Sequence, residues 1–283
     1  MTATRRLLVC VVVAAGLAGC GSAAATTGSS TTSTTTSTTT TSSSTTTTMP
    51  TTTTTTVRPA RPLTGVVVGL DPGHNGGNWR DPAFIDRTVS NGISTEPCDT
   101  TGTATDAGYT EARFNWNVAI DVRRDLAVLG AHVVLTRPSN NGVGPCITTR
   151  ALLLDRANVD VAFDIHADGG PPGGRGFAIL VPVRDRWNHR VVHESLRLAH
   201  VLRATFRAIT KMPWSTYDGV DAIQPRNDLA GLNLTTVPKV LIECGNMRNP
   251  TDAALLASPA FQRLAARAIT DSVLVFLGRR VTA

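Results

Sequence analysis

Four short segments of the chain each place an acidic or metal-binding residue at, or just past, the end of an apolar run. They are residues 69–74 (GLDPGH), 109–111 (YTE), 163–168 (FDIHAD) and 241–246 (LIECGN). A charged group that ends a buried run needs a partner or a function, because burying an unpaired charge is costly. The chain must therefore fold so that these distant segments meet suitable partners.

The order of the expected elements favours one architecture. Strands are expected at residues 66–70, 132–136, 161–165, 176–181 and 240–243, and helices at 111–129, 148–158, 187–209 and 259–277. Strands that alternate with helices form α/β domains, so we expect a single domain whose largely parallel, twisted sheet is flanked by helices. The segment 75–110 is too long and polar for a simple connection, and it is expected to be functional.

Three candidate residues fall at one edge of this sheet. His74, His166 and Glu243 each follow or end a different expected strand, and Glu111 begins a helix that can lie beside them. Ligands of such sheets bind outside the carboxyl ends of the strands. Two histidines and one glutamate can hold a zinc ion with one position open, and a second glutamate can move protons. The sequence therefore predicts a zinc site with hydrolase chemistry at the C-terminal edge of the strands.

Aspartates close to the histidines are candidates to orient them. A histidine that binds a metal generally donates its other ring N–H to a carboxylate or a carbonyl group. Asp71, and either Asp164 or Asp168, are placed for this role. Glu111 has an alternative interpretation, because an acidic residue at a helix N-terminus is stabilised by the helix dipole.

The other histidines and Cys244 are interpreted as structural. His189 and His193 are four residues apart on the expected helix 187–209, but Arg197 stands where a zinc-protease helix needs its second histidine. We expect this helix to present a solvated face. Cys244 directly follows the glutamate of its strand, so its side chain points to the other face and is expected to be a small buried apolar residue.

The motifs resemble those of a known family. LDPGH (70–74), the helix that begins at Glu111, FDIHAD (163–168) and PKVLIECGNMRNPTDAALL (238–256) are similar to the motifs of the zinc-dependent N-acetylmuramoyl-L-alanine amidases, which are peptidoglycan hydrolases. The segments 135–137 (LTR) and 156–158 (RAN) match further parts of the pattern. Order, spacing and flanking residues agree from about residue 66 to 277, which is nearly the whole expected domain.

The resemblance implies a zinc ion bound by His74, Glu111 and His166, with Glu243 as the catalytic acid/base. The implied reaction is hydrolysis of the amide between N-acetylmuramic acid and L-alanine of the peptidoglycan stem peptide, in cell-wall turnover or remodelling. Two alternatives stay open at this point. One is a zinc peptidase that acts on stem peptides, and the other is a non-catalytic peptidoglycan-binding module.

Residues 1–19 are predicted to be a signal peptide. Two arginines precede an apolar run over residues 7–18, which is too short to span a membrane. The run closes with residues 17–20 (LAGC), which resemble a bacterial lipobox, so Cys20 is predicted to be lipidated. Ordinary secretion, with cleavage near residues 23–25, is the alternative. A lipidated chain would be anchored to the outer face of the cytoplasmic membrane, with its catalytic domain facing the cell wall.

Residues 20–60 are predicted to be a disordered Ser/Thr-rich linker, because they have little apolar surface to bury, and residues 61–283 to be the zinc amidase domain. The formal charge of +6 falls to +4 when Arg5 and Arg6 leave with the signal, and we see no basic block with interleaved aromatic residues. Such a charge favours anionic envelope polymers over nucleic acid as partners. The expected partners are peptidoglycan muropeptides and a lipid anchor in the membrane, and the chain is expected to be a monomer.

Cys98 and Cys146 are predicted to form a disulfide. Both lie in polar loops that contain Pro and Gly, and the export signal implies an oxidising compartment. Closing a loop of this length stabilises a fold by about 4 kcal/mol in the chain-entropy model. Two free thiols are the alternative.

Overall fold

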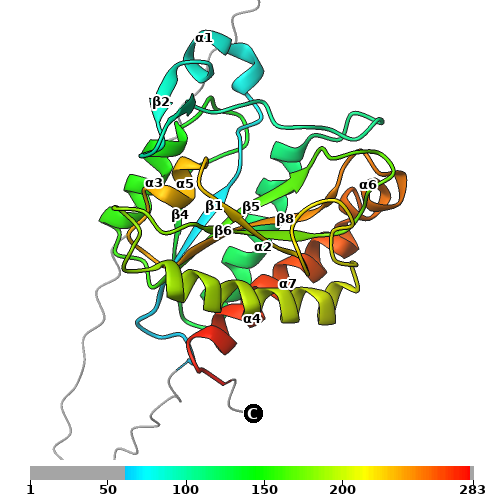
Figure 1. Cartoon of the computed structure of the whole chain (residues 1–283). Helices are drawn as coiled ribbons and strands as arrows, with labels where there is room; N and C mark the ends of the chain where they lie inside the picture. Colours follow the sequence, from blue (N-terminus) through cyan, green and yellow to red (C-terminus); the bar gives the residue numbers. More distant parts are fainter. Residues whose placement is uncertain (1–60, 281–283) are drawn as a thin grey trace, which may run out of the picture. The chain divides into compact units, whose positions relative to one another are not determined.

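The computed structural model describes residues 61–280, and its centre is a six-stranded sheet (Figure 1). The strands are β1 (Val67–Pro72), β4 (His132–Leu135), β5 (Val161–Asp168), β6 (Ala178–Pro182), β7 (Ile223–Arg226) and β8 (Lys239–Asn246). Their order is β4-β1-β5-β8-β6-β7, and the first four run parallel. β6 is antiparallel to β8 and parallel to β7. The predicted α/β domain with a largely parallel sheet is confirmed.

Helices cover both faces of the sheet (Figure 1). On one face, α2 (Glu111–Val128) and α4 (Val192–Thr210) pack against the strands, and α7 (Pro259–Phe276) packs against both of these helices. On the other face lie α3 (Ile147–Arg156) and α5 (Ala230–Asn233). The remaining elements are a 3-10 helix (Asn78–Arg80), α1 (Pro82–Ile85), the hairpin of β2 (Thr88–Ser90) with β3 (Thr95–Pro97), and α6 (Pro250–Leu256).

The main core lies between the sheet and helices α2, α4 and α7. Phe163 and Ile165 of β5 and Ile242 of β8 point to this side and are fully buried. Ala162 and Leu241 point to the opposite side, toward α3 and α5. Successive side chains of a strand alternate between its faces, so the polar residues at the carboxyl ends of β5 and β8 share the second face.

The helix expected to begin at residue 187 begins instead at Val192. Asn188 is buried in the preceding turn, where its amide donates to the carbonyl of Val183 at 3.0 Å and accepts from the N–H of Asp185 at 2.9 Å. Asparagine side chains compete in this way with helical hydrogen bonds. The expected start was wrong because this local capping was not recognised.

The later start separates two histidines that we placed on one helix. His189 lies in the turn, whereas His193 and His200 lie on α4. All three are exposed, so the prediction of a solvated face is confirmed. His189 and His193 therefore do not form the pair on one helix that a zinc-protease helix requires.

A disulfide connects the long polar segment 75–110 to the start of α3. Cys98 and Cys146 are bonded and buried, as predicted. The N–H of Ile147, the first residue of α3, also donates to the carbonyl of Cys98 at 2.8 Å. The segment that follows β1 is thereby attached to the helix layer on the second face of the sheet.

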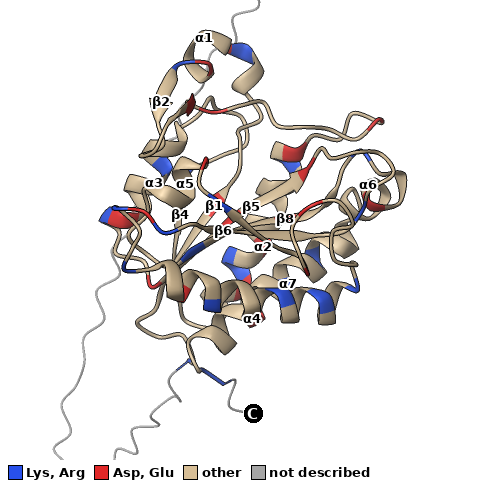
Figure 2. Cartoon of the chain, viewed as in Figure 1, with Lys and Arg blue, Asp and Glu red and all other residues tan. Residues whose placement is uncertain are grey.

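The predicted signal peptide, Cys20 and the linker lie outside the described residues. Within residues 61–280, no helix has the length and apolar character needed to cross a membrane. The Lys and Arg residues of this part are spread over helices, strands and loops, with Asp and Glu among them (Figure 2).

Candidate active site

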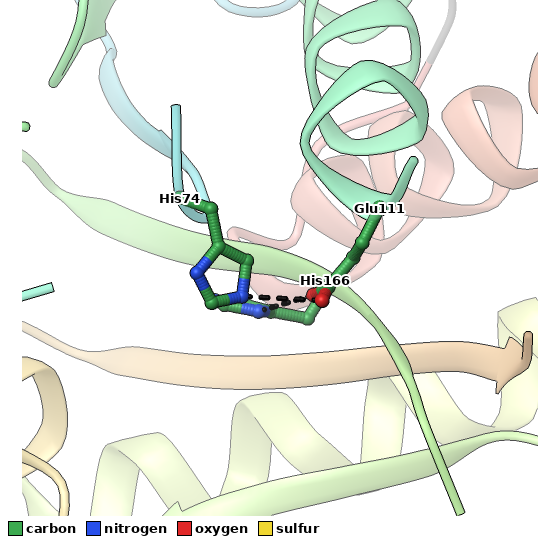
Figure 3. Close-up of side chains that lie close together, drawn as sticks. All are labelled: His74, Glu111 and His166. Atoms are coloured by element: carbon green, nitrogen blue, oxygen red, sulfur yellow. Dashed lines mark hydrogen bonds and ion pairs between the residues drawn. The ribbon is translucent and has the colours of Figure 1, made fainter. Parts of the chain in front are cut away.

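Three side chains from three different elements meet at the carboxyl ends of the parallel strands (Figure 3). His74 lies just past β1, Glu111 is the first residue of α2, and His166 lies near the end of β5. One potential ligand atom of each lies within 4.8 Å of the others. Glu111 is only 4% exposed, so the cluster is largely shielded from water.

Glu111 contacts the two imidazoles through different oxygens. Its Oε2 lies 3.2 Å from His74 Nε2, and its Oε1 lies 2.8 Å from His166 Nδ1 (Figure 3). The N–H groups of Thr103 and Ala167 donate to Oε2 and Oε1 at 2.9 and 3.3 Å. These contacts hold the carboxylate in one orientation between the histidines, in addition to its favourable position at a helix N-terminus.

The second nitrogen of each imidazole faces an aspartate. His166 Nε2 lies 3.1 Å from Asp164 Oδ1, so Asp164 is the partner of this ring out of the two predicted candidates, Asp164 and Asp168. His74 Nδ1 lies 3.4 Å from Asp99 Oδ1 and 3.2 Å from the carbonyl oxygen of Thr100. A carboxylate in this position fixes the tautomer and the ring orientation of a metal-binding histidine.

The other two expected aspartates bond elsewhere. Asp71 accepts from the Thr136 hydroxyl at 2.6 Å, and Asp168 accepts from the N–H of Gly169 at 2.7 Å. Sequence reasoning missed Asp99, which takes the place expected for Asp71 beside His74. The one sequence feature that could have indicated Asp99 is its position next to Cys98, because the disulfide fixes this part of the segment.

Two glycines allow the three side chains to approach. A Cβ atom at Gly73 would overlap the ring of His166, and one at Gly102 would lie 2.7 Å from both Glu111 Oε2 and the ring of His74. His74 itself has a φ of 57°, a left-handed conformation that is uncommon for residues other than glycine. Backbone strain of this kind concentrates at functional sites, where the surrounding structure maintains it.

Glu243 lies beside this cluster in the same cavity. It is paired in register with His166 across strands β8 and β5. The cavity has a volume of about 290 Å³ and is also lined by His74 and His166. Glu243 Oε2 is buried and has no hydrogen-bond partner among the described residues. A buried carboxylate oxygen without a partner is free to bond a substrate or an attacking water.

The environment shifts the pKa of Glu243 in the direction that suits proton transfer. Burial raises the pKa of its carboxyl well above the ordinary value, and the negative charges of Glu111 and Asp168 add to this effect. The nearby charge of His166 acts in the opposite direction but is outweighed. Carboxyl groups whose pKa lies nearer to neutral pH are effective general acids and bases.

The charges around the histidines attract a cation. Burial alone would lower the pKa of His74, but the charge of Glu111 and the hydrogen bond to Asp99 raise it to about 9. Asp164 and Glu111 likewise outweigh burial and raise the pKa of His166 well above its ordinary value. Burial opposes ionisation of Glu111, but the imidazoles lower its pKa. A metal ion must therefore compete with protons for these nitrogens.

The donor set fits zinc. Zinc takes imidazole nitrogens and carboxylate oxygens in tetrahedral sites, and ligand atoms about 2.1 Å from the ion lie roughly 3.4 Å apart. The two contacts of Glu111 with the histidines, at 3.2 and 2.8 Å, are close to this spacing. Three protein ligands leave a fourth position for water or substrate, as in catalytic zinc sites.

A family model described as N-acetylmuramoyl-L-alanine amidase matches residues 68–274 of the chain, which contain all four candidate residues. The chain belongs to this amidase family. Family membership agrees with the resemblance seen in the motifs, and the enzyme is a hydrolase with N-acetylmuramoyl-L-alanine amidase activity on peptidoglycan. Zinc dependence is general in this family, so family and donor set indicate the same cation.

Three amidases to which this chain is similar come from mycobacteria. The chain is 38% identical over 216 residues to the N-acetylmuramoyl-L-alanine amidase Rv3717 of Mycobacterium tuberculosis, covering 76% of this chain and 88% of that protein. The crystal structure of Ami1 from Mycobacterium smegmatis superposes with a TM-score of 0.73 at 42% identity, covering 76% of this chain and 98% of that one. Apo Ami1 from Mycobacterium abscessus gives 0.70 at 39% identity, covering 76% and 100%.

We predict that the zinc affinity of the amidase domain rises with pH through the neutral range. Zinc binds neutral imidazole, whereas His74, with a pKa of about 9, carries a proton below that pH. Apparent affinity should increase about tenfold per pH unit for each proton displaced, because the pKa of His166 is also raised and both rings must lose a proton to bind the ion. Competition with a chelator, corrected for the chelator's own protonation, measures this dependence. An affinity that is constant between pH 6 and 8 contradicts the prediction.

Proposed function

We propose that His74, Glu111 and His166 bind the zinc ion of this amidase and that Glu243 is its catalytic acid/base. The observation that carries the proposal is the geometry of the cluster. Three zinc-type ligand atoms lie within 4.8 Å of one another, beside a buried carboxylate oxygen of Glu243 that has no hydrogen-bond partner within residues 61–280. The general zinc dependence of the family supports the identity of the cation.

When bound, zinc supplies Lewis acidity, polarising the scissile carbonyl and lowering the pKa of water. Glu243 accepts a proton from the attacking water and then delivers it to the nitrogen of L-alanine, so that the amide C–N bond breaks and the amine leaves neutral. The raised pKa of Glu243 suits both steps, because the same carboxyl must take the proton and release it within one reaction cycle.

The lining of the cavity is suited to a peptide next to the scissile bond. Leu180, Leu229 and Leu241 form an apolar part of its wall, and the guanidinium of Arg226 also lines it. Both oxygens of Asp228 accept from Arg226, at 2.7 and 2.6 Å, which orients the guanidinium and offsets its charge. The apolar part of the wall therefore suits the small apolar side chain of the L-alanine next to the scissile bond.

We further propose that the enzyme is exported and held at the outer face of the cytoplasmic membrane. The support is the sequence of residues 1–60, with its signal-like run, its lipobox-like LAGC and its Ser/Thr-rich segment, together with an activity whose substrate lies in the cell wall. A linker of this composition would let the domain 61–283 reach peptidoglycan while Cys20 stays in the membrane.

The Glu243→Gln variant is expected to retain zinc and to lose amidase activity by about 10²–10⁴-fold, because the amide cannot accept the proton. The measurement is a digest of purified muropeptides followed by product analysis, with the zinc content of each variant determined in parallel. Wild-type enzyme should release stem peptides that begin with L-alanine, and a chelator should abolish the release. Cleavage between amino acids would instead indicate a peptidase.

A matched control for this variant is Glu194→Gln on α4, because Glu194 is partly exposed and paired with Arg197. It removes the same charge by the same isosteric change and should leave the digest unaltered. Wild-type product yield from Glu243→Gln would show that another group transfers the proton.

The Cys20→Ser variant tests the anchor. Wild-type full-length chain expressed in a bacterium that lipidates proteins should sediment with the membrane fraction, and Cys20→Ser should appear in the soluble envelope or the medium. Mass spectrometry of the N-terminal peptide checks the modification directly. An unmodified wild-type chain recovered in the medium would support ordinary secretion instead.

A further inference from the structure

Five buried charged side chains connect the two histidines of the site beneath its surface. They belong to Asp99, Arg150, Asp71, Lys239 and Asp164, and none of these residues is more than 8% exposed as a whole. We refer to them as the buried charge chain. They come from five different parts of the sequence, which are the polar segment 75–110, α3, β1, β8 and β5.

One arm of the buried charge chain runs from His74 to Asp71. His74 Nδ1 lies 3.4 Å from Asp99 Oδ1, and the other oxygen of Asp99 accepts from Arg150 at 2.9 Å. Arg150 then donates to Asp71 Oδ1 at 3.1 Å. Arg150 also donates to the carbonyl oxygens of Pro72 and His74 at 2.9 and 2.8 Å, so it fixes the backbone of the turn that carries the histidine.

The other arm runs from Asp71 to His166. Asp71 Oδ2 accepts from Lys239 Nζ at 2.7 Å, and Lys239 Nζ lies 3.4 Å from Asp164 Oδ2. Asp164 Oδ1 in turn faces His166 Nε2 at 3.1 Å. Asp71 is thus the residue at which both arms meet, although it contacts neither imidazole through these bonds.

We propose that Asp71, Arg150 and Lys239 are positioning residues that set the orientation of both zinc-binding imidazoles through Asp99 and Asp164. This inference rests on the zinc site proposed above. An aspartate can orient a histidine only if its own carboxylate is held, and in each arm a buried cation binds the oxygen that faces away from the ring. In a site shielded from water these contacts are strong and geometrically restrictive.

A purely structural role explains the buried charge chain poorly. Buried ion pairs carry a desolvation penalty, and apolar residues of similar size often stabilise a core equally well or better. Burial opposes ionisation of Asp71, yet the charges of Lys239 and Arg150 outweigh it and lower its pKa, so the carboxylate is charged. The three carboxylates and two cations give the buried charge chain a net charge of −1, which favours a cation at the histidines.

The test is the zinc affinity of the folded domain, measured by competition with a fluorescent chelator. Asp71→Asn removes the shared charge without changing shape, and Lys239→Met removes the cation of one arm. Each variant should bind zinc about 10-fold more weakly than wild type, the lower end of the range typical for direct partners of metal-bound histidines, because Asp71 and Lys239 act through Asp99 and Asp164. Leu202→Ala is the control, because Leu202 is a fully buried core residue of α4. It lowers thermal stability but should keep wild-type zinc affinity.

Two further measurements separate positioning from general destabilisation. The double variant Asp71→Asn/Lys239→Met removes both charges of the ion pair between Asp71 and Lys239, so neither is left buried alone. Asp164 still lacks the cation that Lys239 supplies in wild type. Positioning predicts that the double variant regains thermal stability while its zinc affinity stays low. The ¹⁵N resonances of the imidazoles in the zinc-bound protein should shift mainly at His166 in Lys239→Met. Recovery of wild-type affinity in the double variant overturns the proposal.

The design distinguishes failure of this inference from failure of the zinc site. If wild-type domain binds no zinc in the assay, the proposed function is wrong. If wild type binds zinc and the folded Asp71→Asn and Lys239→Met variants bind it equally well, only the positioning role is wrong. The positioning role is also wrong if Leu202→Ala loses as much zinc affinity as Asp71→Asn and Lys239→Met do. Asp71→Asn, being isosteric, keeps the test available if Lys239→Met does not fold.

Discussion

The carboxylate of Glu111 is the group on which the arrangement of the active site depends. It is the first residue of α2, and its two oxygens contact imidazoles that belong to the ends of β1 and β5. These strands are neighbours that run parallel, with Asp71 and Asp164 in register. The start of α2 therefore has to lie at the edge of the sheet where both strands end. The geometry of the active site thus depends on how α2 packs against the sheet.

The alternation of side chains along a strand lets the same segment serve stability and chemistry. In β5, Phe163 and Ile165 enter the main core, while Asp164 and His166 face the site. In β8, Cys244 is buried in the core, and the adjacent Glu243 lines the cavity. The apolar side chains that pack in the core hold the backbone of each strand in place. The polar side chains on the opposite face are therefore held in fixed positions without the use of flexible loops.

The features predicted from the sequence are those that depend on local pattern. Apolar runs revealed the main strands, and the motifs located His74, Glu111 and His166, which the structure brings together in one cluster, and Glu243, which lines the cavity with the two histidines. The disulfide followed from the predicted export of the chain. Apolar runs carry no information on strand direction, however, so the antiparallel pairing of β6 with β8 was not anticipated.

Long-range polar contacts were the features that the sequence did not reveal. Lys239 begins an apolar strand, where a lysine normally reaches solvent, yet it is fully buried because two carboxylates from other strands surround it. Asp99 replaced Asp71 as the partner of His74 because the bonded Cys98 holds the polar segment close to the site. Such placements depend on several segments at once and have no local pattern.

The proposed zinc site requires that β1, α2, β5 and β8 converge at one point. Anomalous diffraction from crystals of the domain, recorded on both sides of the zinc absorption edge, tests this directly. A single zinc peak bonded to His74 Nε2, His166 Nδ1 and Glu111, with the carboxyl of Glu243 facing its open position, is the predicted result. A zinc peak at other residues, or no peak at this cluster in crystals of active enzyme, would contradict it.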